Sequence, residues 1–432
     1  MLTPADIDFI VANEGADVTR LLLGKAPQGI NLPLCCKCIQ AREKMKIKAP
    51  LWYSNPSLAY PFAVSVEQGS SQATALFKQM IISGLLNSTP GTLSENTPIF
   101  PNGSVEDAVG KSKIITADLT GGMGIDSFFI SRIASKHYYF ERNAELCAAT
   151  EYNFRQLDAG NIEVSNRDIT ADDCAALRDL EGKGVSLIYI DPARRTASGG
   201  KAILLQEYEP NVIGLQERLF AVSRYILVKV SPMADIKLNL RHLPHTAAVY
   251  VVAVGNECKE LLFLMDSTAV NNDVDIISIS LDTNGLKNEF RFRPGEEEAA
   301  TATYATELGK YLYEPGKAIL KGGAYKLLSQ KYGCRKLAPS THLYTSDEII
   351  DGFPGKIFKV EEVVPFNKKS LKEVAAKYPK ADLTARNFPM DTNALKKLSG
   401  IKDGGERHIF AATLCNGAKI LAVTSYFQVS EI

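Results

Sequence analysis

One stretch, Ile114–Ile130, constrains the fold more than any other, because it reads as a buried strand, a glycine-rich turn and a helix in direct succession. The turn contains Gly121, Gly122 and Gly124, and the apolar run Phe128–Ile130 predicts the start of the helix. Glycines suit such a turn because a ligand can lie directly against a backbone without Cβ atoms. This order opens a nucleotide-binding α/β unit, although it also occurs in ordinary connections.

Acidic residues follow the next predicted strands at regular intervals. The aromatic strand Tyr138–Phe140 is followed by Glu141, a second short strand leads to Asp168, and the apolar strand Val185–Ile190 runs into Asp191. A carboxylate at a strand end can accept hydrogen bonds from both hydroxyls of a ribose. The alternation of strands and helices predicts a mostly parallel sheet with polar groups along one edge.

These parts, in this order over about Lys111–Asp266, resemble the class I S-adenosylmethionine-dependent methyltransferases. The resemblance implies a Rossmann-like α/β domain with S-adenosyl-L-methionine as cofactor. The methionine part would lie over the glycine turn, the ribose would bind Glu141, and Asp168 would read the adenine amine. The cofactor-binding residues implied in this way are Asp118, Thr120, Gly121, Gly122, Gly124, Asp126, Glu141, Arg142 and Asp168.

An NAD-binding Rossmann unit is the alternative for the same region. It expects the third glycine of G-x-G-x-x-G, and this chain has Ser127 at that place. It also gives no role to the segment Asp191-Pro192-Ala193-Arg194.

That segment is similar to the D-P-P-Y motif of N-methyltransferases, in which the acid and the next carbonyl accept hydrogen bonds from an amine. The stacking aromatic is missing, so Arg194 is expected to stack on a base or to pair with a phosphate, or else to lie exposed in a loop. Lys229 ends a predicted buried strand and is expected to face the pocket, where it can position an acceptor or a phosphate. The catalytic residues implied are Asp191, Pro192, Arg194 and Lys229.

The sequence D-P-A-R also occurs in uracil-C5 RNA methyltransferases, which need a nucleophilic cysteine after the next strand. The matching position here is Ser231, and a hydroxyl is a much poorer nucleophile than a thiolate near neutral pH. We therefore exclude C5 chemistry. The pattern D-x-T-x-G-x-G-x-D from Asp118 to Asp126, with Glu141-Arg142-Asn143, resembles instead a family of small-subunit rRNA guanine-N2 methyltransferases, which implies RNA as substrate.

The C-terminal part has its own pattern of strand, helix, strand, helix and two strands over Lys356–Phe427. This order resembles the RNA-binding THUMP domains of tRNA and rRNA modification enzymes. Between Pro315 and Lys380 there are 13 lysine and arginine residues and six acidic residues. Such a local surplus suits RNA phosphates, although a solvated surface explains it about as well.

Composition limits the remaining possibilities. Lysine plus arginine and aspartate plus glutamate are equal at 49, so a whole-chain basic signature is absent. No apolar run reaches about 18 residues and no signal peptide is recognisable, so we expect no membrane span and a cytoplasmic protein. Cys35, Cys36 and Cys38 form a cluster without a second ligand pair, so we expect buried residues on a helix and no metal.

Four regions are predicted: a helical N-terminal domain (1–96), the methyltransferase domain (97–266), a small β/helical connecting region (267–350) and an α+β, THUMP-like or ferredoxin-like domain (351–432). Within the connecting region, Tyr311–Gln330 is predicted as one or two helices. The functional hypothesis is an S-adenosylmethionine-dependent methyltransferase acting on a base nitrogen of rRNA or tRNA. The alternatives are a protein or small-molecule acceptor, or a non-catalytic RNA-binding relative.

Overall fold

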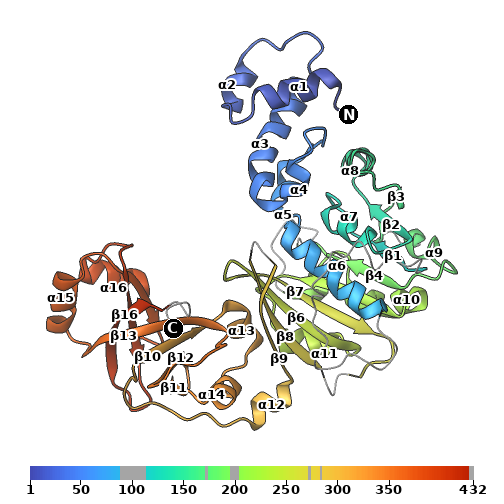
Figure 1. Ribbon diagram of the computed structural model, residues 1–432. Coiled ribbons are helices and arrows are strands. Elements are labelled where there is room, and N and C mark those ends of the chain that lie inside the picture. The colour runs from blue at the N-terminus through green and yellow to red at the C-terminus, as the bar shows by residue number, and fades with distance from the viewer. Residues whose placement is uncertain (88–112, 171–173, 195–203, 271–273, 283–284, 428–432) are drawn as a thin grey trace. The chain divides into compact units, whose positions relative to one another are not determined.

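The computed structural model describes residues 1–87, 113–170, 174–194, 204–270, 274–282 and 285–427 (Figure 1). The chain divides into two compact units, unit 1 (1–254, 259–273 and 281–286) and unit 2 (255–258, 274–280 and 287–432). The predicted loop Asn87–Gly110, with the expected domain boundary at 96/97, falls almost wholly outside the described residues. In the described part of the chain, no helix has the length and apolar character needed to cross a membrane.

Unit 1 begins with a set of helices, as the sequence predicts. They are α1 (Pro4–Ala12), α2 (Val18–Leu23), α3 (Leu32–Lys48), α4 (Pro50–Tyr53), α5 (Ala63–Gln68) and α6 (Gln72–Asn87). Thr3 caps α1, because its hydroxyl accepts from the backbone of Asp6 while the Asp6 carboxylate accepts from the backbone of Thr3. The cysteines of the cluster, Cys35, Cys36 and Cys38, lie buried on α3.

The rest of unit 1 is built around a mostly parallel sheet. Its strands are β1 (Ile115–Asp118), β2 (Lys136–Glu141), β3 (Ile162–Asn166), β4 (Leu187–Ile190), β5 (Tyr225–Val230), β6 (Thr246–Val254) and β7 (Glu257–Asp266). In the sheet they follow the order β3-β2-β1-β4-β5-β7-β6. Ala117 of β1 lies opposite Tyr138 and Ile188 in parallel register, whereas β7 runs antiparallel to β5.

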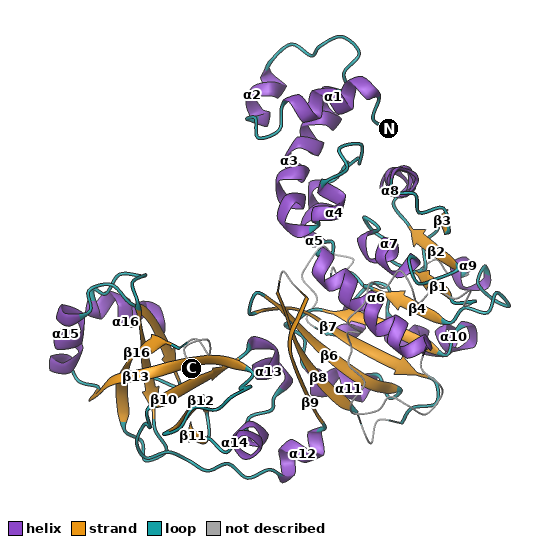
Figure 2. Cartoon of the chain, viewed as in Figure 1, coloured by secondary structure: helices purple, strands orange, loops and turns teal. Residues whose placement is uncertain are grey.

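Helices separate these strands along the chain: α7 (Ile125–Ser131), α8 (Ala144–Gln156), α9 (Ala175–Arg178), α10 (Val212–Val222) and α11 (Ile236–His242). The N-terminal helices pack against this framework, with α6 in contact with α7 (Figure 2). The ring of Trp52 meets that of Phe128 edge to face with centroids 6.1 Å apart, and Met45 and Phe154 belong to the same hydrophobic core. The N-terminal helices are therefore part of the wall around the glycine turn.

Unit 2 contains a second sheet, with the strand order β11-β12-β10-β13-β16-β15-β14. These strands are β10 (Tyr311–Pro315), β11 (Arg335–Ala338), β12 (Thr341–Ser346), β13 (Gly355–Pro365), β14 (Asp382–Arg386), β15 (Arg407–Thr413) and β16 (Lys419–Tyr426). The helices are α12 (Pro294–Ala299), α13 (Lys317–Gly322), α14 (Lys326–Tyr332), α15 (Lys368–Lys377) and α16 (Thr392–Ser399), and β8 (Asp275–Asp282) and β9 (Gly285–Phe292) precede them. From β13 onward, the predicted order of strands and helices is confirmed.

The prediction of helix from Tyr311 onward is wrong for its first residues. Tyr311–Pro315 forms β10, which pairs with both β12 and β13, and helices begin only at Lys317. A short apolar run that is buried on both faces carries no period that separates a strand from a helix, and here the strand partners decide.

Candidate active site

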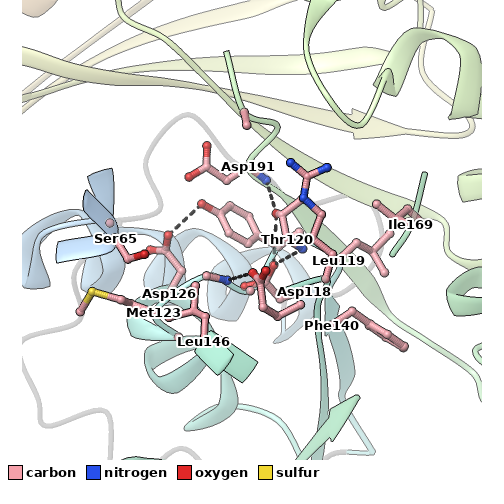
Figure 3. Close-up of a pocket in the computed structure, with 18 of the residues that line it drawn as sticks. Ser65, Asp118, Leu119, Thr120, Met123, Asp126, Phe140, Leu146, Ile169 and Asp191 are labelled. Atoms are coloured by element: carbon pink, nitrogen blue, oxygen red, sulfur yellow. Dashed lines mark hydrogen bonds between the residues drawn. The ribbon is translucent and has the colours of Figure 1, made fainter. Parts of the chain in front are cut away.

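A pocket of about 240 Å³ opens in unit 1 at the carboxyl ends of β1, β2 and β4. Its wall combines the glycine turn, the residues that follow β2, β3 and β4, and residues of α5 and of the segment between α5 and α6 (Figure 3). In Figure 3, Ser65 and Asp126 lie on one side of the pocket and Ile169 on the other. The predicted residues that line it are Asp118, Thr120, Gly121, Gly122, Gly124, Asp126, Glu141, Arg142, Asp168 and Asp191.

Two glycines of the turn are required by close packing. A Cβ on Gly121 would lie 2.0 Å from the ring of Tyr139, and one on Gly124 would lie 2.5 Å from the ring of Phe154. Gly124 also has a φ of +81°, which side chains other than glycine rarely adopt. The turn therefore presses its backbone against β2 and α8, and this packing fixes the shape of the pocket floor.

Asp118, at the end of β1, stabilises the glycine turn through hydrogen bonds. Its carboxylate accepts hydrogen bonds from the backbone N–H of Thr120 at 2.9 Å and from the hydroxyl of Ser127 at 2.6 Å. Burial raises the pKa of Asp118 to about 7, although the hydrogen bonds from Ser127 and Thr120 act in the opposite direction. Asp118 thus links the end of β1 to both sides of the glycine turn.

Glu141 connects β2 to the same turn. One carboxylate oxygen accepts from the backbone N–H of Gly122 at 2.9 Å and the other from that of Asn143 at 2.7 Å. An ionised carboxylate has about four acceptor positions, so Glu141 keeps free positions for the hydroxyls of a ribose. Its neighbour Arg142 pairs with Glu209 at 3.1 Å across the wall of the pocket.

Asp191 lies at the end of β4, and its place is fixed from two directions. Its backbone N–H donates to the hydroxyl of Thr120 at 2.7 Å, and its carboxylate accepts from the Lys229 ammonium at 2.6 Å. Burial would lower the pKa of Lys229, but the charges of Asp191, Glu260 and Asp126 raise it above its ordinary value. Lys229 therefore stays cationic and keeps one oxygen of Asp191 occupied.

Three other residues are predicted as catalytic: Pro192, Arg194 and Lys229. They lie near Asp191, but none of them lines the pocket in the described part of the chain. Pro192 is buried, and Arg194 donates to the hydroxyl of Ser231 at 2.9 Å. Between them, Ala193 exchanges two backbone hydrogen bonds with Glu209, at 2.8 and 3.0 Å. The segment after β4 is thereby tied to the strand-like residues before α10.

Sequence reasoning missed a buried cation beside the pocket. The Lys78 side chain on α6 is 0% exposed, and its ammonium lies 3.1 Å from Asp126 and 2.8 Å from Glu260. The signal was present, because Ala75 and Ile82, three residues before and four after Lys78, are buried on the same face of the helix. A lysine at that spacing indicates a buried partner of opposite charge.

Comparisons with known proteins agree with this architecture. A family model of a ferredoxin-like domain matches residues 311–354, and one described as THUMP domain-like matches residues 355–425. The fold, the glycine turn and the C-terminal match define a class I S-adenosylmethionine-dependent methyltransferase with a C-terminal THUMP-like domain, as the sequence predicts. The cofactor of this class is S-adenosyl-L-methionine.

The family itself follows from a crystal structure of a protein from Porphyromonas gingivalis W83 that is assigned as a methyltransferase. That protein is 30% identical to this chain, the match covers 98% of both chains, and the TM-score is 0.83. The chain therefore belongs to the same family of methyltransferases.

Other solved structures match shorter parts of the chain. A protein from Pyrococcus horikoshii that is assigned as an RNA methyltransferase is 14% identical over 31% of this chain and 54% of its own, with a TM-score of 0.22. A protein from Streptococcus mutans that is assigned as a methyltransferase, solved in complex with SAH, is 15% identical over 35% of this chain and 88% of its own, with a TM-score of 0.28. No curated protein sequence matches the chain.

Replacing Glu141 by glutamine is expected to weaken S-adenosylmethionine binding by about 1–3 kcal/mol, the cost of losing hydrogen bonds to a charged group. Calorimetric titration measures this loss directly. Glu145→Gln is the matched control, because Glu145 is exposed in the first turn of α8. Equal affinities of the two variants would contradict the assignment of Glu141 to the ribose.

Proposed function

We propose that this chain transfers the methyl group of S-adenosylmethionine to a nitrogen of an RNA base. The observation that carries the proposal is the position of Asp191, which lines the same pocket as the glycine turn and Glu141 and is anchored through Thr120 and Lys229. An acid at this place can hold the N–H group of an acceptor next to the cofactor.

Different residues of the pocket bind different parts of the cofactor in this proposal. We assign its methionine part to the glycine turn above Asp118, Thr120 and Asp126, its ribose to Glu141 beside Arg142, and its adenine to Asp168. The carboxylate of Asp168 is itself held, because it accepts from the backbone N–H of Thr170 at 2.8 Å. When bound, the cofactor supplies an electrophilic methyl group on its sulfonium.

On the acceptor side, one carboxylate oxygen of Asp191 is taken by Lys229, which leaves the other to accept the N–H of the acceptor. The carbonyl of Pro192 is the second acceptor in this assignment, as in the motif that the segment resembles. The Lys229 ammonium lies 2.6 Å from Oδ2 of Asp191 and fixes the orientation of the carboxylate. Arg194, next to Ser231, is assigned to a phosphate or a base of the substrate.

Two features support RNA as the acceptor. Residues 355–425 match a THUMP domain-like family model, and the region from Pro315 to Lys380 has 13 basic and six acidic residues. In this proposal, residues 97–266 carry out the chemistry and residues 351–432 bind the RNA. Phosphate contacts from lysine and arginine make such binding strongly dependent on salt.

The test compares RNA from cells with and without this protein by mass spectrometry of nucleosides. We expect one N-methylated base to be missing from rRNA or tRNA of the deletion strain and to return when purified protein and labelled S-adenosylmethionine are added. Unchanged RNA, with label transferred to protein or to a small molecule instead, would contradict RNA as the substrate.

A further inference from the structure

A buried polar cluster forms the pocket wall between the glycine turn and Asp191. It consists of Ser70 from the segment before α6, Asp126 from the first turn of α7 and Tyr189 from β4, all of which line the pocket. One carboxylate oxygen of Asp126 accepts from the hydroxyl of Ser70 at 2.6 Å and from that of Tyr189 at 2.9 Å. The two hydroxyls therefore converge on one atom.

Lys78 fixes the direction of these hydrogen bonds. Its ammonium lies 3.1 Å from the other oxygen of Asp126 and 3.2 Å from the hydroxyl oxygen of Ser70, and it lies 2.8 and 3.0 Å from the Oε1 and Oε2 atoms of Glu260. An ammonium has only donors, so the Ser70 oxygen must accept from it and must send its own proton to Asp126. Burial would raise the pKa of Asp126, but the charges of Lys78 and Lys229 hold it below its ordinary value.

An ionised carboxylate is acceptor-only, so the proton of Tyr189 must also point at Asp126. The O–H groups of Ser70 and Tyr189 therefore both donate to Asp126. Each hydroxyl oxygen keeps a lone pair. At this point the pocket wall therefore offers hydrogen-bond acceptors and no donors. A wall of this kind favours groups with positive charge over neutral ones.

The charges of the surrounding side chains also favour a positively charged group at this wall. The carboxylates of Asp126, Glu260 and Asp191 are paired with the ammonium groups of Lys78 and Lys229. Burial raises the pKa of Glu260, although the charges of Lys78 and Lys229 act in the opposite direction, whereas the pKa of Asp126 is lowered, so the carboxylate that contacts the two hydroxyls is the ionised one. The sulfonium of S-adenosylmethionine has one positive charge, whereas the thioether of the demethylated product has none.

We propose that the hydroxyls of Ser70 and Tyr189, oriented by Asp126 and Lys78, form a subsite that recognises the sulfonium and so distinguishes S-adenosylmethionine from S-adenosylhomocysteine. The inference rests on the proposed cofactor site. Ser70 and Tyr189 are specificity-determining residues in this account, and Lys78 is a positioning residue that acts through Asp126. The N-terminal helices then contribute directly to cofactor selection.

The experiment measures the affinities of the full chain for both ligands by calorimetry and compares their ratio between variants. Tyr189→Phe removes one acceptor oxygen and keeps the ring, and we expect the preference for S-adenosylmethionine to fall about tenfold, as for one hydrogen bond with a charged partner. Ser70→Ala should lower the same ratio by a smaller factor, because Lys78 already occupies part of that oxygen.

Tyr225→Phe is the control, because Tyr225 lies at the opposite end of β5 from the pocket, and its ratio should equal that of the unaltered protein. A parallel loss of affinity for both ligands, or an unchanged ratio in both test variants, would overturn the inference while leaving the cofactor site in place. Failure of the unaltered chain to bind either ligand would instead contradict the proposed function, and this inference with it.

Discussion

Replacing Asp191 by asparagine is expected to slow methyl transfer by about 10²–10³-fold at saturating cofactor and RNA, while the affinity for S-adenosylmethionine stays unchanged. The amide cannot present an anionic oxygen to the acceptor N–H, and its NH₂ group can face the Lys229 ammonium, which lies 2.6 Å from the carboxylate in the unaltered chain. Single-turnover kinetics with a labelled methyl group measure the rate, and calorimetry measures the affinity.

The control for this prediction is a substitution of Asp168, which is assigned to the cofactor and not to the acceptor. Asp168 also lines the pocket, and it is assigned to the adenine. Asp168→Asn should therefore weaken cofactor binding and leave the rate at saturating cofactor nearly unaltered. If Asp191→Asn kept the full rate, or lost cofactor affinity in the same way as Asp168→Asn, Asp191 would not be the residue that holds the acceptor.

Replacing Lys78 by methionine is expected to lower the free energy of unfolding by about 3–5 kcal/mol, because it leaves Asp126 and Glu260 buried without their common cation. Urea unfolding of the full chain measures this loss. Lys44→Met is the matched control, since Lys44 pairs with Glu67 on the surface, where both side chains are about half exposed. Removal of such an exposed pair costs about 0–1 kcal/mol.

The loss in Lys78→Met should also depend on pH. Burial raises the pKa of Glu260 even when Lys78 is present. Without the cation, burial raises it further and also raises that of Asp126 above the values of the unfolded chain, which are about 4. The folded variant then binds more protons than the unfolded one, so its stability falls as pH rises from about 4 through the raised pKa values. The loss should be larger at about pH 8 than at about pH 5.5, and adding Glu260→Gln should recover part of it. If Lys78→Met lowered the free energy of unfolding only slightly, and equally at both pH values, the buried ion pairs of Lys78 with Asp126 and Glu260 would be contradicted.

Much of unit 1 could be predicted because strands at the centre of the parallel sheet, such as β4, are apolar runs followed by a polar residue. The predicted strand Val185–Ile190 contains the observed β4, and Asp118, Glu141 and Asp191 all lie at the carboxyl ends of their strands in the pocket wall. Local patterns suffice here, because the strand, the turn and the acid are adjacent in the sequence. The same holds for the strands and helices after Gly355.

The parts that could not be predicted depend on pairing between distant residues. Lys78 and Glu260 are 182 positions apart, and nothing local to either shows that α6 packs beside β7. Either Ser70 or Ser71 can be read as the cap of α6; Ser71 accepts from the backbone of Thr74 in that role, whereas the Ser70 hydroxyl bonds to Asp126. The strand Tyr311–Pro315 was missed for the same reason, since its partners in β12 and β13 come later in the chain.

In the function that we propose, S-adenosylmethionine binds over the glycine turn, with its ribose on Glu141 and its sulfonium near Asp191. A crystal structure of the full chain soaked with S-adenosylhomocysteine tests it most directly. We expect the ribose hydroxyls within hydrogen-bond distance of the Glu141 carboxylate and the sulfur on the side of Tyr189 and Asp191. Density for the ligand at any other place, with this pocket closed or empty, would contradict it.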